Sequence, residues 1–319
     1  MPRGPLTFIS ADEIDALLDF PSLIEALRDA FCTDIETPLR HHHAIARGDG
    51  EAALLLMPAW TKEKEASFLG TKVVTVYPGN LAKGIGSVAG TYLLMSGDTG
   101  EPLAAIDGHR LTLWRTAAAS ALAAEYLARE DASHLLLIGA GALAPYLARA
   151  HAAVRPIKKV SIWNRTRQRA EALAEELSGE AFKAEVVSDL EGAVRDADIV
   201  TCITLSKMPV FSGDWLKAGA HADLVGAFRP NAREADDAAI MRSRIYVDTR
   251  RGALKEAGDL VIPMAAGIIK ESDVVADLFD LCRGQAKGRE TRDEITLFKS
   301  VGTALEDLAA AIKVWKKRA

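Results

Sequence analysis

The sequence contains little cysteine, and the cysteines it has are scattered. Its three cysteines, Cys32, Cys202 and Cys282, are odd in number, far apart and in no metal-ligand spacing. Neither a disulfide framework nor a cysteine-based metal site is therefore expected. The pattern predicts buried, reduced thiols in a cytoplasmic protein.

Long apolar runs and a strong excess of one charge are also missing. No stretch is long enough to span a bilayer, and residues 1–5 (MPRGP) do not begin the apolar run of a signal peptide. A formal net charge of −5 gives no reason to expect nucleic acid or an anionic membrane as partner. With 319 residues and no internal repeat, the chain is long enough for two domains.

The most informative segment is a strand–turn–helix–strand pattern that begins near the middle of the chain. Residues 134–138 (HLLLI) are typical of a strand buried on both faces. They lead into a turn of the G-x-G-x-x-G/A form, made of Gly139, Ala140, Gly141, Ala142, Leu143 and Ala144. Gly139 permits a sharp turn, Gly141 lets backbone amides approach a pyrophosphate, and Ala144 lets the next helix pack close to the strand. The pattern predicts a bound dinucleotide, and the alternative is a tight turn without a ligand.

The residues after the second strand predict which dinucleotide is bound. Residues 160–163 (VSIW) form that strand, and Asn164, Arg165, Thr166 and Arg167 follow it. NAD sites usually place an acid here to bind the ribose hydroxyls, whereas arginine suits a 2′-phosphate. We therefore expect NADPH as the preferred cofactor with NADH possible, and Arg165 and Thr166 as phosphate contacts. Arg167 is a further candidate, unless it belongs to the solvated face of the next helix.

The order of the expected elements predicts the fold class. Short strands at 52–57, 68–77, 90–95 and 101–106 indicate an α+β domain with a mainly antiparallel sheet. A helix over 112–128 follows, and from 134 to about 247 strands alternate with helices. That alternation predicts an α/β unit with a Rossmann-type, doubly wound parallel sheet. The last segment, 297–317, is expected to include a helix.

Three basic residues outside the glycine turn are candidates for a small-anion site. Arg115 lies three residues after Thr112, which is expected to cap the helix, so its charge would add to the helix amides. Lys72 lies in the apolar strand 70–74 (GTKVV), where a lysine is unfavourable unless an anion neutralises it. Arg40 begins another expected strand. At Lys72 and Arg40 the alternative is a surface charge.

Three consecutive histidines raise the question of a metal. In a strand, His41 and His43 share a face, but no acid or cysteine lies at ligand spacing nearby. A polar strand or a pocket-lining role for one of the three is preferred, and no metal is expected.

At this point the sequence resembles the ornithine cyclodeaminase/mu-crystallin family over nearly its whole length. The resemblance is carried by residues 70–74, 78–80, 99–102, 107–108, 112–118, the glycine turn, 226–230, 298–302 and 306–307. It implies that residues 1–114 together with 300–319 form a substrate-binding and dimerisation domain, and that residues 115–299 form the Rossmann domain. It also implies a homodimer with its substrate pocket between the domains.

The resemblance also implies roles for individual residues. Arg40, Lys72 and Arg115 match the family's contacts to the substrate carboxylate, and residues 300–302 match the loop near the nicotinamide, with Ser300 and Gly302 as cofactor contacts.

One position departs from the family pattern. Cyclodeaminases and the alanine dehydrogenase relatives carry an aspartate before the proline of the 226–230 segment, where this chain has Phe228. Phenylalanine can neither accept a proton nor orient a water, both of which deamination requires. Reduction of a preformed cyclic imine requires neither, and an aromatic wall suits an apolar ring.

These observations lead to one hypothesis and two alternatives. We expect NAD(P)H-dependent reduction of a small cyclic ketimine carboxylate, with Δ1-pyrroline-2-carboxylate to L-proline as the leading case. Arg115 and Arg40 are expected to hold the carboxylate, with Lys72 near it and the imine nitrogen. The enzyme alternative is ornithine cyclodeaminase with catalytic NAD⁺. The alternative from another class is an NADPH-dependent small-ligand-binding protein of the mu-crystallin type.

Overall fold

The structure is a computed structural model that describes residues 6–47, 50–62, 67–77, 79–80, 86 and 88–318. Residues 1–5 and Pro78 of the expected 78–80 turn lie outside these described residues. The chain divides into two compact units, the first within Met1–Thr116 and Thr303–Ala319 and the second within Ala117–Gly302.

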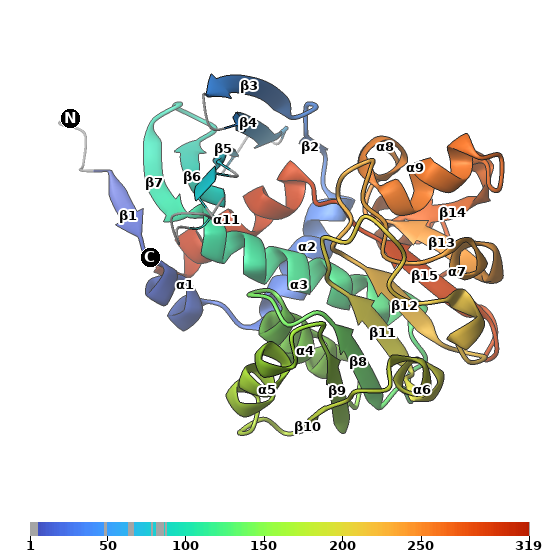
Figure 1. Ribbon diagram of the computed structural model, residues 1–319. Helices are drawn as coiled ribbons and strands as arrows, with labels where there is room; N and C mark the ends of the chain where they lie inside the picture. The colour runs from blue at the N-terminus through green and yellow to red at the C-terminus, as the bar shows by residue number, and fades with distance from the viewer. Residues whose placement is uncertain are drawn as a thin grey trace. The chain divides into compact units, whose positions relative to one another are not determined.

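The first unit is built on a mainly antiparallel sheet (Figure 1). Its strands run in the order β1-β7-β6-β5-β4-β2, with β3 also paired to β4, and only β1 and β7 are parallel. The strands are β1 (Thr7–Ile9), β2 (Ile35–Glu36), β3 (His41–Arg47), β4 (Gly50–Thr61), β5 (Phe68–Val76), β6 (Val88–Ser96) and β7 (Pro102–Asp107). The expected α+β domain with a mainly antiparallel sheet is confirmed.

Two capped helices lie near the start of the first unit, and the last helix of the chain packs on its sheet. Helix α1 (Ala11–Leu17) begins at a capping box made by Ser10 and Glu13, and Asp19 caps α2 (Phe20–Cys32). Helix α11 (Ala304–Arg318) packs on α2 and on β4, β5 and β6. The end of the chain thus returns to the first unit.

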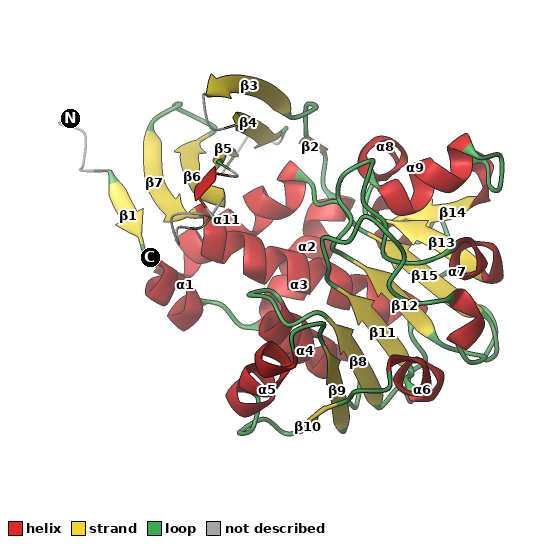
Figure 2. Ribbon diagram, viewed as in Figure 1, coloured by secondary structure: helices red, strands yellow, loops and turns green. Residues whose placement is uncertain are grey.

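The second unit has the expected doubly wound parallel sheet, in the order β10-β9-β8-β11-β12-β15-β13-β14. Its strands are β8 (His134–Ile138), β9 (Lys159–Trp163), β10 (Lys183–Val186), β11 (Ile199–Cys202), β12 (His221–Leu224), β13 (Ser243–Val247), β14 (Val274–Asp277) and β15 (Ile295–Lys299). The connecting helices include α4 (Ala144–Val154), α5 (Arg167–Glu176), α6 (Leu190–Asp196), α7 (Asp237–Arg242), α8 (Arg250–Glu256), α9 (Gly258–Ala265) and α10 (Leu278–Cys282). Figure 2 shows helices α4 to α9 beside the sheet.

Apolar strands make the centre of this sheet. Every residue of β8, β11, β12 and β15 is buried, which the apolar run at 134–138 predicts for β8. Strand β15 was not expected, because residues 297–299 fell in a segment that was expected to include a helix. The helix begins at Ala304 instead, and β15 inserts between β12 and β13.

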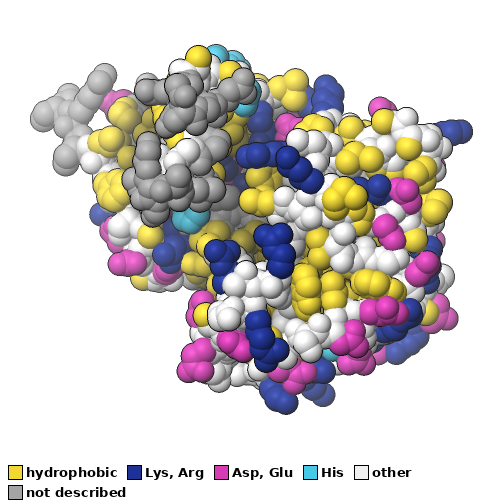
Figure 3. All heavy atoms as spheres, in the orientation of Figure 1, with side chains coloured by type: hydrophobic (Ala, Val, Ile, Leu, Met, Phe, Trp, Pro, Cys, Tyr) yellow, Lys and Arg dark blue, Asp and Glu magenta, His cyan; other side chains and the backbone are white. Residues whose placement is uncertain are grey.

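The distribution of surface charge agrees with the small net charge, but the burial of the cysteines agrees only in part with the prediction. Basic and acidic side chains are interspersed over the part of residues 117–302 visible in Figure 3. Cys202 is buried and Cys282 is half-buried, but Cys32 at the end of α2 is exposed, so the prediction of buried thiols is wrong for Cys32. Among the helices of the described residues, none has the length and apolar character needed to cross a membrane.

Candidate active site

Lys72 lies on β5 in the first unit and is buried, with 4% of its surface exposed. Its ammonium lies 2.8 Å from Oδ2 of Asp307 on α11 and donates a hydrogen bond of 2.9 Å to Oδ1. It also donates a 3.4 Å hydrogen bond to the Thr112 hydroxyl. The lysine is therefore neutralised in part from within the chain, by an acid that lies 235 residues later in the sequence.

Arg115 joins the same cluster, although not in the way the sequence predicts. Helix α3 (Gly108–Leu127) begins four residues before Thr112, because the Asp107 carboxylate accepts the Arg110 N–H at 2.7 Å and caps it. Thr112 lies inside the helix and donates its hydroxyl to the Gly108 carbonyl. The predicted Thr112 cap is wrong, and so is the argument that Arg115 lies in the first turn of the helix.

What holds Arg115 is instead a pair of buried acids on α11. Its Nη1 lies 2.6 Å from the Glu306 carboxylate, and its Nε lies 3.0 Å from that of Asp307. Arg115 is 6% exposed, whereas both acids have no exposed surface. Charge-assisted bonds of this kind fix the orientation of a guanidinium. In the sequence, residues 306–307 are only part of the family pattern, and nothing there indicates that they hold Arg115.

Three cations come together in this basic cluster. Lys72 and Arg115 carry two positive charges, and Arg40, just before β3, is close enough to lower the pKa of Lys72. Two carboxylates, those of Glu306 and Asp307, face these three cations. Buried cations that can still donate hydrogen bonds favour an anion such as a carboxylate.

The environment also changes the proton affinity of Lys72. Burial lowers its pKa to about 8, and the charges of Arg115 and Arg40 act in the same direction, while Asp307 opposes them. An ammonium with that pKa can give up a proton near neutral pH more readily than an ordinary lysine.

A tyrosine that the sequence gave no reason to select lies opposite Lys72. Tyr92 on β6 pairs with Lys72 across the β5–β6 register, and it is fully buried. Burial raises the pKa of its hydroxyl well above the usual value, and that hydroxyl has no hydrogen-bond partner among the described residues. Gly70 leaves room for its ring, because a Cβ there would lie 2.3 Å from the Tyr92 hydroxyl.

The glycine turn has the local geometry that a pyrophosphate requires. Gly139 has φ of 119°, and a Cβ at that position would lie 2.8 Å from the Ile203 carbonyl oxygen. A Cβ added at Gly141 would meet nothing within 4 Å, so the backbone there is open to a close ligand. Helix α4 begins at Ala144, and its amino-terminal end follows this turn. A dinucleotide fits these residues.

The loop after β9 is tied to that turn. The Asn164 side chain accepts the Ala140 N–H at 3.2 Å and donates to the Thr166 carbonyl at 2.8 Å. Thr166 caps α5 without using its side chain, and Arg165 is exposed. Arg167 is engaged by Glu171 at 2.8 Å, which favours the interpretation of Arg167 as part of the helix surface.

The segment after β15 is ordered by a buried acid. Asp248 accepts the N–H groups of Val301 and Gly302, each at 2.7 Å, and burial raises its pKa. Gly302 has φ of 80°, in the left-handed region. Ser300 is buried, and its N–H donates to the Leu224 carbonyl of β12. Ser300 and Gly302 thus lie at the carboxyl edge of the parallel sheet.

Phe228 lies in the loop after β12 and is 40% exposed. The Arg229 guanidinium lies 5.5 Å from the centre of its ring. Together with Leu205 and Gly226, these residues line a cavity of about 150 Å³ in the second unit.

The three histidines lie on β3 as expected, with the His41 and His43 rings 6.4 Å apart. Within the part of the chain that the structure describes, no group of three or more His, Cys, Asp or Glu residues is placed to hold a metal ion.

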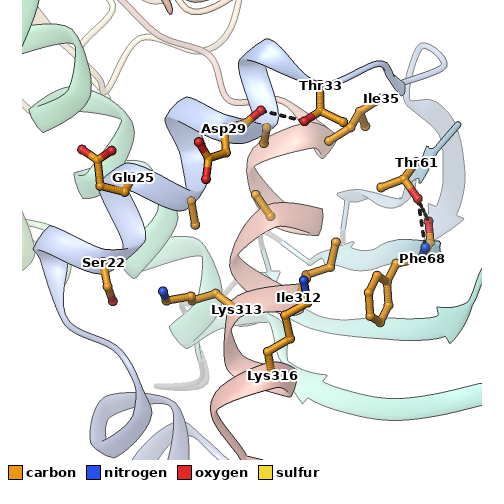
Figure 4. Close-up of a pocket in the computed structure, with 13 residues that line it drawn as sticks. Ser22, Glu25, Asp29, Thr33, Ile35, Thr61, Phe68, Ile312, Lys313 and Lys316 are labelled. Carbon is orange, nitrogen blue, oxygen red and sulfur yellow. Dashed lines mark hydrogen bonds between the residues drawn. The ribbon is translucent and has the colours of Figure 1, made fainter. Parts of the chain in front are cut away.

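The first unit has another cavity, of about 530 Å³, that the basic cluster does not line. Figure 4 shows that Glu25 and Asp29 of α2 contribute to it, as do Lys313 and Lys316 of α11. The charged residues that line this cavity are two acids and two lysines, so their formal charges cancel.

Comparison with known proteins places this arrangement in a family. The profile of the ornithine cyclodeaminase/mu-crystallin family matches residues 8–319.

The chain belongs to this family.

The chain is 43% identical over 325 residues to an uncharacterised protein of Schizosaccharomyces pombe, with 98% of each chain covered. It is 39% identical over 321 residues to a Δ1-pyrroline-2-carboxylate reductase of Colwellia psychrerythraea, covering 98% of this chain and 100% of that one. Among solved structures, it matches Thermococcus litoralis Δ1-pyrroline-2-carboxylate reductase in complex with NADH and L-proline. The TM-score is 0.91 at 35% identity, with 98% of this chain and 97% of that one covered.

Proposed function

We propose that this family member reduces a small cyclic ketimine carboxylate with NAD(P)H, and that its leading substrate is Δ1-pyrroline-2-carboxylate, which becomes L-proline. It is an NAD(P)H-dependent oxidoreductase that acts on a C=N group, the class of the named reductases it resembles. One observation carries the substrate assignment. Three cations, the buried Lys72 and Arg115 and the half-buried Arg40, lie close together beside the acids Glu306 and Asp307.

Binding of the substrate follows from this charge. The carboxylate of the imine replaces part of the lost hydration of Lys72 and Arg115, and Arg40 completes the set of cations. Because Glu306 and Asp307 hold the Arg115 guanidinium in place, little side-chain entropy is lost when the carboxylate binds. The nicotinamide supplies a hydride to the imine carbon when it is bound. Holding and orienting the substrate electrostatically provides most of the rate enhancement.

Protonation of the imine nitrogen completes the reduction. Lys72 is the proposed donor, because its ammonium has a pKa lowered to about 8 and Asp307 orients it. Solvent is the other source of this proton. The two differ in their pH dependence, because only the lysine loses its proton near pH 8.

Phe228 supports reduction over ornithine cyclodeamination. Its side chain offers no acceptor for the proton of an amine and none for a water. Its ring instead lines a cavity of about 150 Å³ and lies 5.5 Å from the Arg229 guanidinium. We propose that it serves as an aromatic wall for the substrate ring.

The proposed NADPH preference depends on the loop after β9. Replacing Arg165 by alanine is expected to raise the KM for NADPH by about 10- to 100-fold, because a charge-assisted bond to the 2′-phosphate is lost. The KM for NADH is expected to change less than about twofold, because NADH has no such phosphate. Steady-state kinetics with both cofactors measure this. Arg169→Ala, on the following helix α5, is the matched control, and an equal change for both cofactors would show that Arg165 does not contact the phosphate.

The proposed reaction is tested by oxidation of NADPH at 340 nm with Δ1-pyrroline-2-carboxylate, with NADH in parallel. Rapid oxidation supports imine reduction. Ammonia release from ornithine with NAD⁺, without oxidation of NADPH by the imine, would instead establish the cyclodeaminase. Tight NADPH binding without turnover of any imine or amino acid would favour a binding protein of the mu-crystallin type.

Other expectations from the sequence stay predictions. These are the homodimer, the cytoplasmic location and the division of roles between residues 1–114 with 300–319 and residues 115–299. The roles given to individual site residues are proposals of the same kind.

A further inference from the structure

Glu234, in the loop after β12, is fully buried, and the proposed chemistry does not use it. Its Oε1 accepts the Thr204 N–H at 2.6 Å and the Thr204 hydroxyl at 3.1 Å. Its Oε2 accepts the N–H groups of Gly226 at 2.7 Å and Ala227 at 3.0 Å. Thr204 follows β11 by two residues, and Gly226 follows β12 by two. One carboxylate therefore ties together the loops that leave two neighbouring parallel strands.

The two loops are packed closely around this carboxylate. A Cβ at Gly226 would lie 1.9 Å from the Thr204 carbonyl oxygen and 2.6 Å from Oε1 of Glu234. Only glycine fits at that position without displacing backbone. The cavity of about 150 Å³ beside it is lined by Leu205 and Lys207 from the first loop and by Phe228 from the second. The positions of the cavity walls thus depend on the Glu234 contacts.

Buried charges hold Glu234 itself in place. Lys299, at the end of β15, has its ammonium 3.1 Å from Asp259 and 3.7 Å from Glu234, and all three are without exposed surface. Asp259 also accepts the Glu234 N–H at 2.7 Å. Burial raises the pKa of Glu234 to about 7, against the opposing charge of Lys299. The four donors and the nearby ammonium compensate for the hydration that the buried carboxylate of Glu234 has lost.

The strand order indicates what this geometry serves. In doubly wound sheets the ligand lies beyond the carboxyl ends of the strands, across the point where the strand order reverses. That point is between β8 and β11 here, and the glycine turn follows β8. With the pyrophosphate at the turn and the adenosine ribose near the loop after β9, the loops after β11 and β12 are left for the nicotinamide half (Figure 1).

We propose that Glu234 is a positioning residue for the nicotinamide half of the cofactor, acting by holding the loops after β11 and β12 together. The inference rests on the proposed nicotinamide cofactor, and it does not depend on which imine is the substrate. The proposal assigns the two halves of the cofactor to different residues. The adenine half is held by other residues and is independent of Glu234.

The test compares NADPH with 2′-phospho-ADP-ribose, which lacks the nicotinamide, in binding to the full chain by titration calorimetry. Glu234→Gln keeps the size of the side chain but places an amide nitrogen against one set of donors. The Kd for NADPH is expected to rise about tenfold, because hydrogen bonds to a charged group are lost. The Kd for the fragment is expected to change less than about twofold. Because binding is measured, failure of the imine assay with an unchanged binding pattern would overturn only the proposed substrate.

A matched control lies two residues away. Asp236 also accepts backbone N–H groups, those of Gly213 in the short helix Gly213–Trp215 and of Ala239 in α7, so it joins the starts of two helices and not the residues that directly follow β11 and β12. Asp236→Asn is expected to lower the Tm and to leave both Kd values within about twofold. If Glu234→Gln weakens both ligands equally, or neither, the inference is wrong.

A milder variant covers the case in which Glu234→Gln does not fold. Thr204→Val keeps the shape of the side chain and removes one of the four donors to Glu234. It is expected to raise the Kd for NADPH about threefold and to leave that of the fragment unchanged. An unchanged Kd for NADPH in this variant would contradict the inference, and absence of NADPH binding to the unaltered chain would overturn it together with the cofactor assignment.

Discussion

Replacing Lys72 by methionine is expected to lower kcat/KM for Δ1-pyrroline-2-carboxylate by about 10³-fold or more. The substitution keeps the length of the side chain but removes a buried charge from the substrate carboxylate and the proposed proton donor from the imine. Asp307 keeps its contact with Arg115, so the fold is expected to persist. Initial rates of NADPH oxidation measure the loss.

The pH profile separates a role of Lys72 in catalysis from one in packing. The pKa of Lys72 is lowered to about 8, so its ammonium loses a proton as the pH rises through that value. The kcat/KM of the unaltered protein is therefore expected to fall above about pH 8. In Lys72→Met the residual activity should not show this decline. A variant with full activity, or with the same decline, would show that the lysine has been assigned wrongly.

Replacing Arg115 by alanine is expected to reduce both activity and stability. The kcat/KM should fall by about 10³-fold, because the substrate carboxylate loses its paired donor. The free energy of unfolding should fall by about 3–5 kcal/mol, because Glu306 is left as a buried acid without this guanidinium. Initial rates measure the first effect, and urea denaturation measures the second.

Arg129 offers the matched control for this substitution. It is also largely buried and pairs with two acids, Asp198 and Asp131, of the second unit, whereas the basic cluster belongs to the first unit. Arg129→Ala is expected to lower stability and to leave the kcat/KM of the folded protein within about twofold. Arg115→Ala with unchanged kcat/KM would remove Arg115 from the site.

The local parts of this structure could be predicted from the sequence. The apolar run at 134–138 and the glycine turn predict β8, the positive φ of Gly139 and the start of α4, because neighbouring residues determine them. Lys72 was conspicuous for a similar reason, since a charge in an apolar strand needs a partner.

What the sequence could not predict depends on contacts between distant residues. The partner of Lys72 is Asp307, 235 residues away, and no spacing rule connects the two. Glu234 looks like an ordinary surface acid until folding brings the loops after β11 and β12 onto its two oxygens. The Thr112 cap was wrong because Asp107 offers a better capping carboxylate one turn earlier.

The most direct test of the central claim is the stoichiometry of the reaction with Δ1-pyrroline-2-carboxylate. NADPH oxidised is followed at 340 nm, and L-proline formed in the same sample is quantified by chiral chromatography. Imine reduction predicts one L-proline for each NADPH oxidised, with no ammonia released. Oxidation of NADPH without proline, or no oxidation at all, would contradict the account.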